Sequence, residues 1–136
     1  MIIGLGCDIV NIERLNKSAD FLQDLKAKIL GENELAELKR QIIADDKKLA
    51  CILAKRYAAK EAFAKALGCG FRDGIFLKNI ETLHDKLGKP YLKISGEAQK
   101  KLQELSAKAK THISLSDDYP HAQAVVIIEE YNINAD

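Results

Sequence analysis

The sequence predicts an α+β fold in which an antiparallel or mixed β-sheet packs against helices. Positions 2–10 form an apolar run that is typical of a strand. Helical periodicity follows from about residue 18 to residue 67, and the rest of the chain consists mainly of short apolar runs separated by turn residues. One tight antiparallel connection is expected at residues 85–90, which favours strands that pair with their neighbours along the chain.

The first half of the chain after the initial strand is expected to be helical. Amphipathic patterns place apolar side chains on one face of each segment, and glycines follow the segments. Gly31 separates two of the helices, while Gly68 and Gly70 end the longest one. The predicted helical segments are residues 11–16 (a short turn), 18–30, 32–43 and 45–67.

The second half is expected to consist of strands with one further helix. Strands are predicted at residues 75–84, 91–94, 111–116 and 122–131, and the helix from residue 95 or 96 to about residue 110. Pro90 stands at the start of a returning strand, where proline is tolerated. The run Ala-Val-Val-Ile-Ile at 124–128 is apolar throughout, so it should form the central, buried strand.

Composition limits the possible classes of protein. The 136 residues match the length of one domain, which we take as residues 1–136, and 47% apolar with 30% charged residues supports a packed core. The net charge of +1 argues against a general nucleic-acid binder, and any attraction to an acidic partner must come from a local patch. No run of about 18 apolar residues is present, which excludes a spanning helix from the prediction.

The cysteines and histidines indicate no structural metal site. Cys7, Cys51 and Cys69 are far apart, and no CxxC pair or secretory segment accompanies them. We therefore expect reduced thiols in a cytoplasmic protein, with Cys7 and Cys51 in the core. The three histidines lack the spacing of metal ligands, so a zinc site is not expected.

Residues 55–68 carry the densest chemical signal. Arg56 and Lys60 form one i,i+4 pair and Glu61 and Lys65 another, so that each pair shares a helix face. One carboxylate among several cations suits a site that binds a divalent metal and phosphates. The alternative is a solvated helix face, on which each such pair contributes only about 0.2–0.5 kcal/mol.

Asp8 is the second candidate carboxylate because it interrupts an otherwise apolar or small-residue strand. A buried carboxylate without a partner costs several kcal/mol, so Asp8 requires one. Gly4 and Gly6 weaken the strand but allow a ligand or another backbone to approach closely. A purely structural alternative makes Asp8 a helix cap, although Asn11 is better placed for that role.

These residues resemble the holo-[acyl-carrier-protein] synthases, which are small bacterial 4′-phosphopantetheinyl transferases. The resemblance depends on Gly4-Leu-Gly-Cys-Asp8-Ile-Val-Asn-Ile-Glu-Arg14 and on Arg56-Tyr-Ala-Ala-Lys60-Glu61-Ala-Phe-Ala-Lys65-Ala-Leu-Gly68. Weaker matches occur at residues 29–35, 79–82, 88–91 and 112–116, in the family's order along nearly the whole chain.

The resemblance implies the fold of these transferases and the transfer of 4′-phosphopantetheine from coenzyme A to a serine of apo acyl carrier protein, with release of adenosine 3′,5′-bisphosphate. It implies that Asp8 and Glu61 hold Mg²⁺, which prefers carboxylates, phosphates and water as ligands. Lys65 would contact phosphate oxygens. Glu61 is one candidate general base, and Glu34 is another in a matched motif.

The resemblance also implies binding residues and an assembly. Arg14 and Lys28 match basic positions that face the acidic carrier protein, and we add Lys26 from the same region. Family members form trimers with coenzyme A in clefts between protomers, so a homotrimer is expected. The positions expected to bind coenzyme A are Arg56, Lys60, Gly68, Pro90, Ser114 and Ser116.

One departure from the family concerns Asp117. The family often carries a histidine after the Ser-x-Ser pattern, whereas this chain has Ser114-Leu-Ser116-Asp117. An aspartate would repel the nucleotide phosphate of coenzyme A, so another cation would have to serve there.

Rival functions remain open from the residues alone. The first is another Mg²⁺-dependent phosphoryl enzyme acting on coenzyme A or a nucleotide pyrophosphate, with water as nucleophile. The others are a non-catalytic binder of acidic proteins and a nucleic-acid binder, and the near-zero net charge argues against the last.

Overall fold

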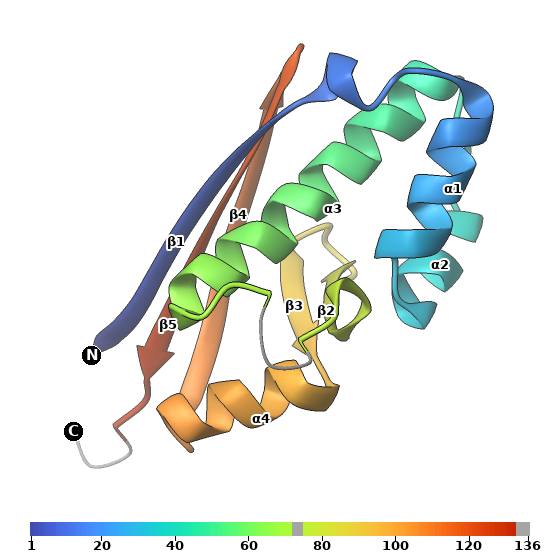
Figure 1. The fold of residues 1–136 in the computed structure, drawn as a ribbon. Coiled ribbons are helices and arrows are strands. Elements are labelled where there is room, and N and C mark those ends of the chain that lie inside the picture. The colour runs from blue at the N-terminus through green and yellow to red at the C-terminus, as the bar shows by residue number, and fades with distance from the viewer. Residues whose placement is uncertain (72–74, 133–136) are drawn as a thin grey trace.

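A three-stranded antiparallel sheet and the long helix that crosses one of its faces form the centre of the fold (Figure 1). The computed structural model describes residues 1–71 and 75–132. The elements are β1 (Ile2–Asn11), η1 (Ile12–Arg14), α1 (Ala19–Ile29), α2 (Glu32–Lys39), α3 (Asp46–Leu67), η2 (Leu77–Asn79), β2 (Ile80–His84), β3 (Pro90–Ile94), α4 (Gly96–Leu105), β4 (Ala109–Asp118) and β5 (His121–Glu130), where η marks a single 3₁₀ turn.

The larger sheet has the strand order β1-β5-β4, and all of its neighbours are antiparallel. β5 is central, as the apolar run at 124–128 predicted, and its alternate residues Ala124, Val126 and Ile128 are buried against α3. β2 and β3 form a separate antiparallel pair. The predicted α+β class with helices packed on antiparallel strands is therefore confirmed.

The strand β1 lies unusually close to α3 because it presents glycines to the helix. A Cβ atom built on Gly6 would lie 1.8 Å from the carbonyl oxygen of Ala62, and one on Gly4 would lie 2.4 Å from that of Ala66. The facing helix residues are alanines, which keep the surface of α3 flat at this contact. The close approach predicted from the two glycines is thus an approach of helix backbone to strand backbone.

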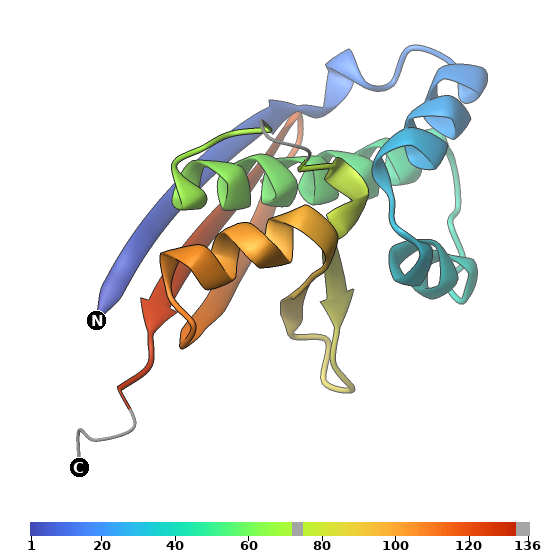
Figure 2. The same ribbon diagram turned by 60° about the horizontal axis from the view of Figure 1, so that its bottom comes forward.

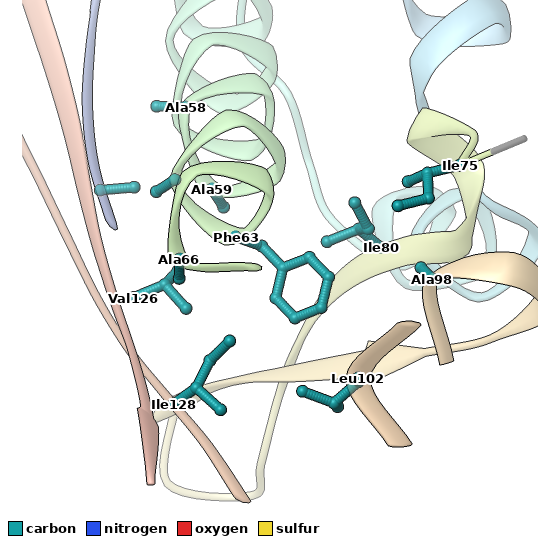
Figure 3. Packing of buried hydrophobic residues seen from close by; sticks show 12 residues of the cluster. Ala58, Ala59, Phe63, Ala66, Ile75, Ile80, Ala98, Leu102, Val126 and Ile128 are labelled. Carbon is teal, nitrogen blue, oxygen red and sulfur yellow. The ribbon is translucent and has the colours of Figure 1, made fainter. Parts of the chain in front are cut away.

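Two apolar clusters cover the length of α3. The first lies along its C-terminal half, where Phe63 packs among Ile80, Leu102 and Ile128 (Figure 3). α4 contributes to this cluster and lies beside α3 (Figure 2). The second cluster joins the N-terminal half of α3 to α1 and α2. Because both clusters contact α3, the helix is surrounded by protein on most sides.

Side-chain caps set the starts of three helical segments. Asn11 accepts a hydrogen bond from the amide of Glu13 at 3.0 Å, so it caps η1 as predicted. Ser18 and Asp45 cap α1 and α3 in the same way. Gly68 ends α3 at a φ of 80°, a left-handed conformation that glycine adopts without strain.

Several predicted boundaries were wrong. The strand expected at 75–84 begins only at Ile80, because η2 precedes it. The helix expected to reach residue 43 ends at Lys39, since the next three side chains, Arg40, Gln41 and Ile42, are exposed and bury no surface that would hold another turn. The helix expected to reach residue 110 ends at Leu105, because Ala109 already pairs with Glu130 of β5.

The other face of the larger sheet is open and apolar. The apolar run at positions 2–10 is typical of a buried strand, but within this chain the strand is only partly buried, because Ile2, Leu5 and Ile9 are each more than 60% exposed. Cys7 is also exposed on this face and Cys51 is only partly buried, so neither is the core residue expected. Among the helices of residues 1–71 and 75–132, none is long and apolar enough to cross a membrane.

Candidate active site

Two carboxylates from distant parts of the sequence line one groove. Asp8 comes from β1 and Glu61 from α3, and the groove has a volume of about 550 Å³. The strand and the helix that carry them run side by side (Figure 1). The same groove is lined by Asn11, Arg14 and Lys28, so acidic and basic candidates are brought together.

Asp8 points to the face of β1 that is covered by α3, and its partner comes from that helix. Lys65 Nζ donates to Asp8 Oδ1 at 3.0 Å and to the carbonyl oxygen of Cys7 at 2.9 Å. The hydrogen bond to Asp8 raises the pKa of Lys65. Lys65 therefore remains a cation at the edge of the groove, and 53% of its side chain is exposed.

Glu61 lies one turn before Lys65 on α3 and four residues after Tyr57, which also lines the groove. Burial raises the pKa of Tyr57, and the charges of Glu61 and Asp8 add to this effect. Tyr57 was not among the predicted site residues, although its i,i+4 spacing from Glu61 was a signal for it.

The donor set fits a hard divalent cation that shares its ligands with a substrate. In the described residues no cluster of three or more histidine, cysteine or acidic side chains is assembled as a complete metal site. Mg²⁺ commonly binds through one or two carboxylates and takes its other ligands from phosphates and water. Asp8 and Glu61 in one open groove, with Lys65 beside them, match that pattern.

The predicted docking residues divide into two groups. Arg14, at the end of η1, and Lys28, near the end of α1, are exposed and line the groove. Lys26 is only partly exposed and is not part of the groove lining. The structure therefore brings Arg14 and Lys28, but not Lys26, to the two carboxylates.

The prediction that Arg56 and Lys60 face coenzyme A phosphates is contradicted by their burial. Lys60 is 0% exposed and Arg56 is 4% exposed. Arg56 donates to Glu37 Oε2 at 2.7 Å, and Lys60 donates to Glu34 Oε1 at 2.6 Å. Glu34 is itself 0% exposed, so the suggestion that it acts as a general base is also wrong.

Four other residues predicted to bind coenzyme A are not part of the groove lining. Gly68 ends α3, and Pro90 opens β3 opposite His84. Ser114 and Ser116 are exposed on β4, on the sheet face opposite α3.

The departure at Asp117 has a visible consequence. Asp117 Oδ1 lies 3.2 Å from Lys55 Nζ, and Lys55 lowers the pKa of the carboxyl. Asp117 lines a separate hollow of about 470 Å³ that also contains Lys47, Lys48 and Tyr119. Asp117 is thus paired with one lysine, and the hollow holds two further lysines together with a second carboxylate, Asp45.

Comparison with known proteins gives consistent matches over nearly the whole chain. Residues 4–124 match the model of the 4′-phosphopantetheinyl transferase superfamily. The holo-[acyl-carrier-protein] synthase of Erythrobacter litoralis is 44% identical over 137 residues, covering 98% of this chain and all of the relative. That of Trichlorobacter lovleyi is 45% identical over 129 residues, covering 95% of this chain and 98% of the relative.

Solved structures show the same fold with ligands. The acyl carrier protein synthase of Plasmodium yoelii with ADP bound is 34% identical with a TM-score of 0.85, covering 97% of this chain and 98% of that one. A Bacillus anthracis holo-(acyl-carrier-protein) synthase in complex with CoA (3′,5′-ADP) is 31% identical with a TM-score of 0.75, covering 96% and 99%. The resemblance found in the sequence is therefore confirmed, and the chain belongs to the holo-[acyl-carrier-protein] synthases of the 4′-phosphopantetheinyl transferase superfamily.

Proposed function

We propose that this chain transfers the 4′-phosphopantetheine group of coenzyme A to a serine of an apo acyl carrier protein in a Mg²⁺-dependent reaction. The serine oxygen forms a bond to the phosphorus that carries pantetheine, the pyrophosphate bond breaks, and adenosine 3′,5′-bisphosphate leaves. The proposal depends above all on Asp8 and Glu61 in one groove with Lys65 beside them.

Asp8, Glu61 and Lys65 each have a role in this proposal. Asp8 and Glu61 would hold Mg²⁺, which when bound supplies a Lewis acid at the phosphoryl oxygens and neutralises charge on the leaving phosphate. Lys65 has an exposed ammonium that can reach phosphate oxygens as negative charge develops. The attacking hydroxyl must lose a proton, and Glu61 is the candidate acceptor, directly or through water.

The deciding experiment is mass spectrometry of an apo carrier protein incubated with coenzyme A, Mg²⁺ and this chain. We expect the carrier to gain the mass of one phosphopantetheine group. When Mg²⁺ is chelated, the mass of the carrier should stay unchanged. Hydrolysis of coenzyme A without carrier protein would instead support a water-using phosphoryl enzyme. Carrier binding without any mass gain would support a non-catalytic binder.

Carrier docking is assigned to the basic rim of the groove. Arg14→Ala is expected to raise the KM for the carrier protein about tenfold and to leave the KM for coenzyme A nearly unchanged, because carriers are acidic and Arg14 is exposed at the rim. Steady-state kinetics with each substrate varied in turn measures both constants. Lys89→Ala, which removes an exposed lysine of the β2–β3 turn, is the control. An equal rise of both KM values after Arg14→Ala would contradict the docking role.

The open sheet face supports a homotrimer. Ile2, Leu5 and Ile9 are exposed apolar residues on β1, and exposed apolar patches of this kind mark contact surfaces. Ile9 belongs both to this face and to the groove lining, so assembly through the face would place another protomer beside the groove, where coenzyme A is proposed to bind. Gly68, Pro90, Ser114 and Ser116 remain candidate coenzyme A contacts in that assembly.

Leu5→Glu is expected to dissociate the trimer into monomers, because burying an unpaired carboxylate in an apolar interface is costly. Light scattering after size exclusion measures the mass. Ile42→Glu is the matched control, because Ile42 is 99% exposed in the connection after α2 and lies outside the sheet. A Leu5→Glu variant with the mass of the wild-type assembly would rule out this interface.

We take residues 1–136 as a single transferase domain that works in the cytoplasm. Cys7, Cys51 and Cys69 are free thiols, which supports a reducing compartment.

A further inference from the structure

Lys60 carries a buried ammonium group that the proposed reaction does not use. Its Nζ atom donates to Glu34 Oε1 at 2.6 Å, to the carbonyl oxygen of Leu77 at 3.0 Å and to the carbonyl oxygen of Ile80. An ammonium group has three protons, so each has an acceptor inside the protein. Lys60 has no donor left for a phosphate, which calls for another reason for its presence.

The partner carboxylate is equally enclosed. Glu34 Oε1 also accepts from the amide of Gly31 at 3.1 Å, and Oε2 accepts from the amide of Thr82 at 3.1 Å. Burial raises the pKa of Glu34 and lowers that of Lys60, while the attraction between the two groups opposes both shifts. The pair therefore joins the start of α2, the strand β2 and the middle of α3 at one buried point.

The two carbonyl groups held by Lys60 belong to Leu77, the first residue of η2, and to Ile80, the residue that follows it, and η2 forms part of the groove wall through Leu77. Leu77 lines the groove together with Glu61 and Tyr57. The same three residues border a neighbouring apolar hollow of about 450 Å³. A single 3₁₀ turn has poor hydrogen-bond geometry and little stability of its own, so a wall built from one needs an anchor.

The geometry points to Lys60 as a positioning residue that clamps the η2 wall of the groove onto the turn of α3 carrying Glu61. It acts through the carbonyl groups of Leu77 and Ile80 and does not touch the substrate. Its consequence for kinetics rests on the proposed function, whereas the clamp itself is a property of the fold and can be tested without any substrate.

Amide hydrogen exchange of the wild-type chain is the first test. The amide of Asn79 donates to the carbonyl of Phe76 at 3.0 Å, and that of Ile80 donates to Leu77. If Lys60 clamps this turn, both amides should exchange within about tenfold of the rate in the middle of α3. Exchange as fast as in the exposed turn at 85–88 would overturn the proposal.

The double variant Lys60→Met/Glu34→Gln is the second test. It removes both charges at once and so avoids leaving one buried charge without its partner. We expect the amides of Asn79 and Ile80 to exchange at least about tenfold faster than in the wild type, with central β5 amides unchanged. We also expect the KM for coenzyme A to rise about tenfold with kcat within about twofold, because the wall shapes binding.

Leu102→Ala separates this role from general destabilisation. Leu102 lies on α4, is 6% exposed in the core and does not line the groove, so its truncation lowers the fraction of folded enzyme and hence the apparent kcat without changing KM. If the double variant behaved like Leu102→Ala in both constants, the positioning role would be rejected. Should the double variant not fold, the wild-type exchange rates decide. Absence of transfer by the wild-type chain would count against the proposed function alone.

Discussion

Asp8→Asn and Glu61→Gln are each expected to slow phosphopantetheine transfer by at least about 100-fold while the chain stays folded. Each change keeps the size of the side chain and removes one negative charge from the groove that contains both carboxylates. Neither carboxylate is fully buried, and Asp8 is paired with a half-exposed lysine, so the free energy of unfolding should change by no more than about 1 kcal/mol. The time course of carrier mass gain and thermal unfolding measure the two effects.

Glu97→Gln is the matched control for these variants. Glu97 accepts a hydrogen bond from Lys100 at 2.9 Å on the exposed surface of α4, which resembles the contact of Asp8 with Lys65 at 3.0 Å. Its transfer rate should equal that of the wild type. Wild-type rates in both Asp8→Asn and Glu61→Gln would remove the metal-binding assignment and with it the main support for the proposed reaction.

Asp8 could be found in the sequence because local rules make it conspicuous. An aspartate in an apolar strand contradicts strand propensity, and such contradictions concentrate at functional sites. Gly4 and Gly6 carried a related signal, since a strand with glycines on one face allows close approach of another backbone. The sequence did not reveal that this backbone is α3, because the pairing of β1 with α3 is a tertiary contact.

Arg56 and Lys60 were misassigned for a geometric reason. Consecutive helix positions are about 100° apart, so Lys60 and Glu61 face different surroundings although they are neighbours in the chain. The side of α3 that carries Arg56 and Lys60 is covered by Glu34 and Glu37 from α2. In a helix that is buried on most sides, hydrophobic periodicity does not separate the face toward the groove from the face toward another helix.

The open sheet face illustrates a second limit of prediction from sequence patterns. Positions 2–10 are apolar on both faces, which is the pattern of a strand buried on both sides. Within one chain, α3 covers only one of these faces, and Leu5 and Ile9 remain exposed. A sequence pattern reports that a face is to be buried, but it does not distinguish burial inside the chain from burial between copies.

Gly6→Ala is expected to destabilise the chain by about 3 kcal/mol or more, at the upper end of the usual cost of overpacking. The added methyl group would lie 1.8 Å from the carbonyl oxygen of Ala62 and 2.8 Å from the amide nitrogen of Ala66, and neither backbone atom can turn aside as a flexible side chain can. β1 must therefore move away from α3. Denaturant unfolding measures the loss of stability.

The same substitution should affect transfer more than stability alone explains. Asp8 is two residues from Gly6 on the same face of β1, so displacement of the strand moves one carboxylate away from Glu61. A shift of about 1 Å in a catalytic group can cost roughly 100-fold in rate. Cys7→Ala is the control, because Cys7 lies between them on the open face, where the change meets no part of α3. If folded Gly6→Ala protein transferred at the rate of Cys7→Ala, the contact between strand and helix would not set the distance between the two carboxylates.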